Sequence, residues 1–83
     1  MSTNFLDVEL PQGVVSADDW TGIGNEFTGV QLRVVHTRNG SRLQIVSPKQ
    51  ETSILLDPLA LEAITAQEPD FFTRLIAART GAE

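Results

Sequence analysis

The stretch from Val30 to Leu56 limits the possible folds of this 83-residue chain more than any other segment, because it predicts three consecutive antiparallel strands. Val30, Leu32 and Val34 alternate with polar residues, which is the period of a strand with one buried face. Asn39-Gly40 follows and predicts a tight hairpin turn, since both central positions of a type I′ turn need positive φ. We therefore expect an antiparallel sheet whose strands follow one another along the chain.

The two turns in this stretch predict registers that agree with each other. The first turn pairs Arg38 with Ser41, and the second, a polar break with a proline, pairs Ser47 with Thr52. The face expected to be buried holds Val30, Leu32, Val34, His36, Leu43, Ile45, Ile54 and Leu56. We expect the strands at residues 30–37, 42–47 and 53–56.

Two helices are predicted after the third strand. Asp57 suits an N-cap and Pro58 the first helical position, which starts a helix over residues 58–67. Pro69 ends that segment and opens a second helix over residues 69–79. The predicted fold class is therefore α+β: a three-stranded antiparallel meander, a C-terminal helical hairpin on one face of it, and an irregular N-terminal arm.

The predicted arm, residues 1–28, differs in composition from the domain at residues 29–83. Up to residue 28 the arm carries five acidic and no basic residues, so the formal net charge of −5 belongs wholly to it. It is too apolar for a disordered tail, yet glycines and a proline interrupt it. Ser16 to Trp20 is expected to start a helical turn. The arm either covers the chain's own sheet or clasps a partner chain.

Length and composition exclude several classes of protein. A single domain of this size has a marginal core, and the chain has no Cys for disulfides or thiolate metal sites. We therefore expect that binding to a partner, or self-association, adds to the stability of this small core. The acidic balance disfavours nucleic-acid binding, and no apolar run is long enough to cross a membrane. With no signal peptide visible, we expect a cytoplasmic protein.

Few residues of the sequence suggest a catalytic, metal-binding or cofactor-binding role. Gly22-Ile23-Gly24 lacks the third glycine of a dinucleotide loop, and antiparallel strands follow it in place of a βαβ unit. His36 is the only histidine, so a metal site would lack further His or Cys ligands. We expect a structural role for His36, and we expect no catalytic residue, no metal and no cofactor.

The outer face of the predicted sheet mixes valine, leucine and arginine, a composition that suits a protein contact. The alternative is a solvated face with scattered apolar residues. Together with apolar residues of the arm, this face supplies the predicted partner-binding set: Trp20, Ile23, Phe27, Arg33, Val35, Arg42, Val46 and Leu55.

Residues 24–72 resemble a known family. The motifs that carry the resemblance are Gly24-Asn25-Glu26-Phe27, Val35-His36-Thr37-Arg38-Asn39-Gly40, Arg42-Leu43, Ser47-Pro48 and Leu56-Asp57-Pro58-Leu59-Ala60-Leu61-Glu62. They resemble very small bacterial proteins, mainly actinobacterial, that carry the label dihydrodiol dehydrogenase. The resemblance implies a setting in aromatic or xenobiotic catabolism, beside oxygenases or metal-dependent hydrolase-like enzymes, and it assigns no site residue.

The leading functional hypothesis is a non-catalytic accessory subunit that stabilises or completes a larger catabolic enzyme. The partner is then an oxygenase or a hydrolase-like enzyme, or a second copy of the chain. The alternative is a homodimer that binds or carries an apolar small molecule. A third hypothesis is a small enzyme that uses His36 as its acid or base.

Overall fold

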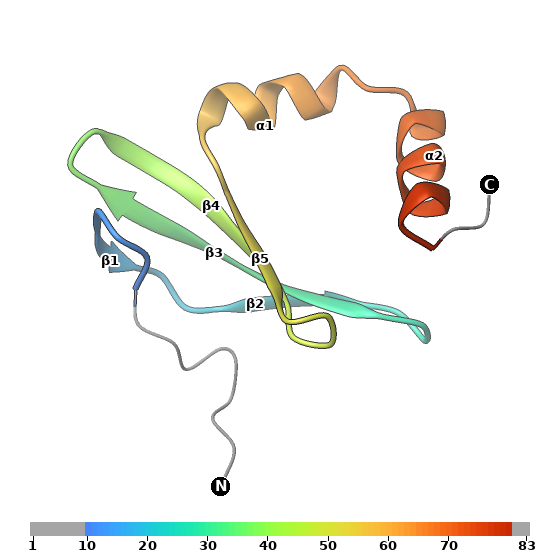
Figure 1. Ribbon diagram of the computed structural model, residues 1–83. Coiled ribbons are helices and arrows are strands. Elements are labelled where there is room, and N and C mark those ends of the chain that lie inside the picture. Colours follow the sequence, from blue (N-terminus) through green and yellow to red (C-terminus); the bar gives the residue numbers. More distant parts are fainter. Residues whose placement is uncertain (1–9, 81–83) are drawn as a thin grey trace, which may run out of the picture.

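The computed structural model describes residues 10–80, and in it five strands form one antiparallel sheet that two helices follow (Figure 1). The fold class is therefore α+β. The elements are β1 (Val14–Ala17), β2 (Thr21–Gly24), β3 (Gly29–Thr37), β4 (Gly40–Ser47), β5 (Thr52–Leu56), α1 (Pro58–Thr65) and α2 (Pro69–Thr80). Residues 1–9 of the predicted arm lie outside the described part.

The sheet has two more strands than predicted, and both come from the arm. The strand order is β1-β3-β4-β5, and β2 also pairs with β3. β1 pairs with the end of β3 and β2 with its beginning, so the two short strands follow one edge of β3 in succession. An irregular arm was therefore the wrong prediction for residues 14–24. β3 has nine residues, and without β1 and β2 the amides and carbonyls along one of its edges would have no hydrogen-bond partner in the sheet.

β1 contains a bulge, and a three-residue link separates it from β2. The register shifts between Val14 and Ser16, which leaves Val15 as the extra residue of a β-bulge. The expected helical turn at Ser16 is not formed, because Ser16 pairs with His36 and the Asp18 amide donates to the Val34 carbonyl at 2.9 Å. Pairing with β3 thus overrides the local helix-start pattern.

The first hairpin turns one residue earlier than predicted. Thr37 pairs with Gly40, so Arg38 and Asn39 form the turn. The Thr37 hydroxyl donates to the Gly40 carbonyl at 2.8 Å and accepts from the Asn39 amide at 3.2 Å, which stabilises this tighter turn. The pairing register thereby shifts by two residues, which keeps every side chain on its predicted face. The β4–β5 register, with Ser47 opposite Thr52, is confirmed.

The most buried side chains of the sheet lie on the face that was not predicted to be buried. We call the set from Val30 to Leu56 that was expected to be buried the apolar face, and the face with Arg33, Val35, Gln44 and Val46 the mixed face. On the mixed face Val35 is 0% exposed, Val46 2% and Gln44 3%. Val34 and Ile54 on the apolar face are exposed. The other six residues of the apolar face are half-buried, so this face is less buried than predicted.

The placement of the helices explains this reversal. Asp57 caps α1 as predicted, and its carboxylate accepts from the Ala60 amide at 2.8 Å. α1 contacts β4 and β5, but no comparable contact extends from the sheet to α2 (Figure 1). The prediction of a helical hairpin packed on the sheet is therefore wrong, and the apolar face lacks the cover that it would have supplied.

Candidate functional site

The mixed face is organised around Arg33, which lies between the edge of the sheet and its centre. The Arg33 guanidinium carbon lies 4.1 Å from the ring centroid of Trp20, in a cation–π contact. Its Nε donates to the Gln44 side-chain oxygen at 2.8 Å, and the Gln44 amide in turn approaches the Ser53 hydroxyl at 3.5 Å. This row joins the β1–β2 link to β3, β4 and β5.

One atom of this row has no partner in the described part of the chain. The Nη2 of Arg33 is buried and makes no hydrogen bond there. A buried donor without an acceptor costs stability, so Arg33 is held by Trp20 and Gln44 without being fully satisfied. The row fixes the edge strand in place and leaves Arg33 little freedom to reach another molecule.

The structure divides the predicted partner-binding set into three groups. Val35 and Val46 are buried, and they offer no surface to another chain in this structure. Trp20, Arg33 and Leu55 are half-buried, the first two against each other. Ile23, Phe27 and Arg42 are exposed. Of these, Ile23 and Phe27 lie together at one hairpin, whereas Arg42 is on β4.

The β2–β3 hairpin holds Phe27 in the open. The Asn25 carboxamide oxygen accepts from the Phe27 amide at 2.8 Å and from the Thr28 amide at 3.0 Å, and the Asn25 amide donates to the Thr28 carbonyl. These bonds fix the turn, yet Phe27 is 75% exposed. A large aromatic side chain on a fixed turn is the type of residue that anchors protein interfaces.

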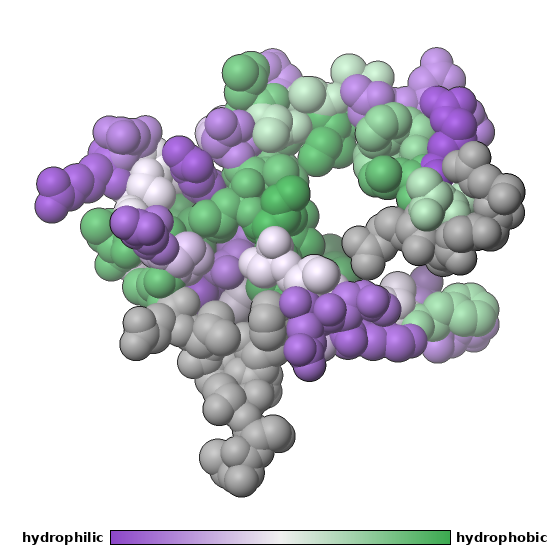
Figure 2. Space-filling model, viewed as in Figure 1, coloured by the Kyte–Doolittle hydropathy of each residue, from purple (hydrophilic) through white to green (hydrophobic). Residues whose placement is uncertain are grey.

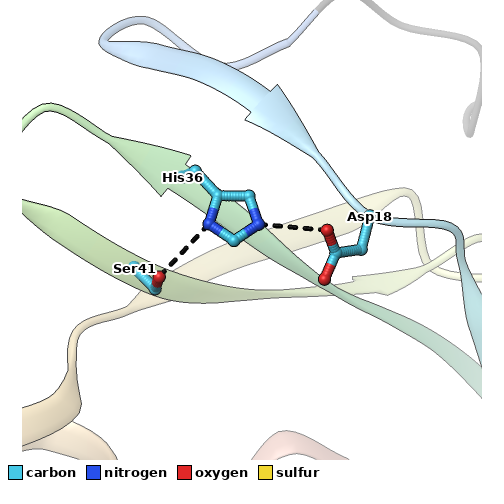
Figure 3. Close-up of polar contacts among 3 residues, drawn as sticks. All are labelled: Asp18, His36 and Ser41. Atoms are coloured by element: carbon cyan, nitrogen blue, oxygen red, sulfur yellow. Dashed lines mark hydrogen bonds and ion pairs between the residues drawn. The ribbon is translucent and has the colours of Figure 1, made fainter.

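Asp18, His36 and Ser41 come together at the edge of the apolar face (Figure 3). Asp18 Oδ1 lies 3.0 Å from His36 Nε2, and Ser41 Oγ lies 3.3 Å from His36 Nδ1. They come from the β1–β2 link, β3 and β4 respectively. If Nε2 donates to Asp18, then Nδ1 accepts from the Ser41 hydroxyl.

This order of groups is that of an acid, a base and a nucleophile, the arrangement used in acyl transfer. Asp18 and Ser41 were not predicted as partners of His36. The predicted register set His36 opposite Leu43, whereas the observed register sets it opposite Ser41. Placing the hairpin turn one residue earlier would have found Ser41, but Asp18 requires the pairing of the arm with β3.

A groove of about 540 Å³ lies on the other side, near the β3–β4 turn. Thr37, Arg38 and Arg42 line it together with residues that precede and begin β1. Neither arginine makes a salt bridge within the described residues. The groove is the feature that bears on the hypothesis of a small-molecule carrier, and its cationic wall suits an anionic ligand better than a purely apolar one.

The described residues form neither a metal site nor a membrane-spanning helix. Within residues 10–80, no three His, Asp or Glu side chains gather closely enough to hold a metal ion. No helix in that range is long and apolar enough to cross a bilayer. Comparisons of the chain with protein-family models, curated proteins and solved structures find no match.

Proposed function

We propose that this chain is a non-catalytic accessory subunit that stabilises or completes a larger enzyme. The observation that carries the proposal is the β2–β3 hairpin, where Phe27 is 75% exposed on a turn that Asn25 holds in shape. Ile23 on the same hairpin is also exposed. An aromatic anchor that is already ordered loses little entropy on binding, which favours a specific contact.

The sequence supports the same proposal from a different direction. The resemblance of residues 24–72 to small actinobacterial proteins implies a setting beside oxygenases or hydrolase-like enzymes of aromatic or xenobiotic catabolism. We take the partner to be an enzyme of that kind, which would supply the metal, flavin or other reactive group. The acidic charge of −5 adds a reason to expect a protein partner and no nucleic acid.

Replacing Phe27 by Ala is expected to weaken partner binding by about 30-fold, since an anchor residue contributes about 2 kcal/mol or more. The measurement is native mass spectrometry of the tagged chain purified gently from its own host, with and without the substitution. The thermal unfolding of the isolated chain should not change, because Phe27 packs little surface against it.

Val15→Ala is the matched control, because Val15 is an exposed apolar residue at the other end of the same sheet edge. It should leave the complex intact. If the chain is recovered without a larger protein under conditions that preserve complexes, the proposal fails.

A second candidate function, acyl transfer, is favoured by the Asp18–His36–Ser41 contact alone. In this reaction Ser41 Oγ would attack an ester carbon while its proton moves to His36 Nδ1. The alcohol would then leave with that proton, and water would free Ser41 by the same route. Asp18 and Ser41 are exposed and His36 is only half-buried, which argues against efficient catalysis, because solvent weakens the electrostatic stabilisation of the developing charge.

We expect Ser41→Ala to abolish any release of p-nitrophenol from p-nitrophenyl acetate that the isolated chain supports. Ser16→Ala removes the hydroxyl that faces His36 from β1 and serves as the control. Both variants should fold, since both side chains are exposed. Turnover that survives Ser41→Ala and His36→Ala would rule out this function.

A further inference from the structure

The groove of about 540 Å³ on the mixed face lies at the end of the sheet where β3 turns into β4. Three of the residues that line it, Thr37, Arg42 and Leu55, come from three adjacent strands. Thr37 follows Val35 by two residues, and Arg42 pairs with Val35. Leu55 pairs with Gln44, so the side chains of all three lie on the mixed face. Pockets that bind small molecules have volumes of about 300–1,000 Å³, and this groove falls within that range.

Backbone contacts hold both sides of this groove in place. One side is the segment that leads into β1, where Gly13 has a φ of +88° and the Val14 amide donates to the Pro11 carbonyl at 3.1 Å. Val14 then pairs with Thr37. The other side is the β3–β4 turn, where the Thr37 hydroxyl donates to the Gly40 carbonyl. The groove is therefore formed before any ligand enters it, which lowers the entropic cost of binding.

Two arginines supply the charge of the groove. Arg38 in the turn and Arg42 on β4 both line it, and both are exposed. Neither makes a salt bridge within residues 10–80, and no acidic side chain of that range lines the groove. The whole chain has 11 acidic and 6 basic residues, so the sign of charge in this groove is opposite to that of the chain. An anion would give both guanidinium groups the partner that the described residues do not provide.

Apolar side chains line the same groove. Val14 and Leu55 are half-buried there, and Val15 is exposed. Figure 2 shows both strongly hydrophilic and apolar residues at the end of the sheet where the β3–β4 turn lies. A simple inorganic ion would leave the apolar side chains in contact with water, whereas an anion with an apolar body covers them.

We propose that this groove binds a small organic carboxylate. The guanidinium groups of Arg38 and Arg42 hold the carboxylate, and Val14 and Leu55 contact its apolar body. Guanidinium suits this ligand because its planar donors match the two oxygens of a carboxylate. The groove lies at the opposite end of β3 from the turn that carries Phe27, so this site goes beyond the contact proposed for the larger enzyme.

The first test is an NMR titration of the isotope-labelled full chain with straight-chain carboxylates, followed through the backbone amide signals. Hexanoate should shift the signals of residues 13–15 and 38–42 until they saturate, with a dissociation constant of about 1 mM. The affinity should rise about threefold for each methylene added between propionate and hexanoate, because each one leaves water on binding.

Two further ligands separate the contributions of charge and apolar surface. Hexanamide lacks the charge and inorganic phosphate lacks the apolar body, so each should bind at least about tenfold more weakly than hexanoate. Shifts that do not saturate, or an affinity that is independent of chain length, would overturn the proposal. Equal binding of hexanoate and either of these two ligands would overturn it as well.

The second test removes the charge of each arginine in turn. Arg38→Gln and Arg42→Gln should each weaken hexanoate binding by about tenfold or more. Lys49→Gln is the matched control, because Lys49 is an exposed cation in the β4–β5 turn, outside the groove. It should leave the affinity unchanged. Equal weakening in all three variants, or none in any of them, would contradict the site. Both tests use the isolated chain, so this site and the contact with the larger enzyme can fail separately.

Discussion

Replacing Val35 by Asp is expected to leave the chain without a cooperative fold. Val35 is 0% exposed, and an unpaired carboxylate at such a position costs about 3–5 kcal/mol. A domain of 83 residues has a stability of roughly 4–12 kcal/mol, and this one buries few apolar side chains. Urea unfolding followed by circular dichroism measures the loss.

Val15→Asp is the matched control for this experiment. The same atoms are exchanged, but Val15 is 61% exposed at the bulge of β1. We expect a change of less than about 0.5 kcal/mol, as for other surface substitutions. Equal loss of stability in both variants would mean that the mixed face is not the core of the folded chain.

Replacing Gln44 by Leu is expected to cost about 2–3 kcal/mol, although the substitution makes the core more apolar. The Arg33 Nε would lose its acceptor beside an Nη2 that already has none, and buried donors without partners cost about 1–3 kcal/mol each. Removing the guanidinium as well, with Arg33→Met in the Gln44→Leu background, should restore most of the stability.

The double-mutant cycle of these two positions measures their coupling directly. We expect a coupling of about 1.5 kcal/mol or more from urea unfolding of the wild type, both single variants and the double variant. Additive effects would contradict the Arg33–Gln44 bond. Trp20→Ala is the informative third variant, because it removes only the stacking partner of Arg33 and should cost about 1 kcal/mol beyond its lost burial.

Features set by local chemistry were predictable from the sequence. The strands from residue 29 to 56 follow from alternation, and the Asp57 cap with Pro58 at the first helical position fixes the start of α1. The β4–β5 register was also predictable, because a wrong register would place polar residues on the apolar face.

Features that depend on distant contacts were not predictable. β1 and β2 have four residues each, too few for a clear period, and they are stable only as partners of β3. The Thr37 hydroxyl stabilises a hairpin turn one residue earlier than predicted. The register therefore differs by two residues, and the proximity of Ser41 to His36 was not predicted. The apolar stripe of α2 predicted packing on the sheet, but the structure shows no substantial contact between them.

The broken edge strand has a consequence for how the sheet ends. A long straight edge would present a continuous row of free amides and carbonyls, on which strands of other molecules can add without limit. Here the bulge at Val15 and the charged pair Asp18-Asp19 interrupt that row halfway along. A chain that repairs this interruption, by deletion of Val15 and neutralisation of both carboxylates, should therefore be prone to form fibres.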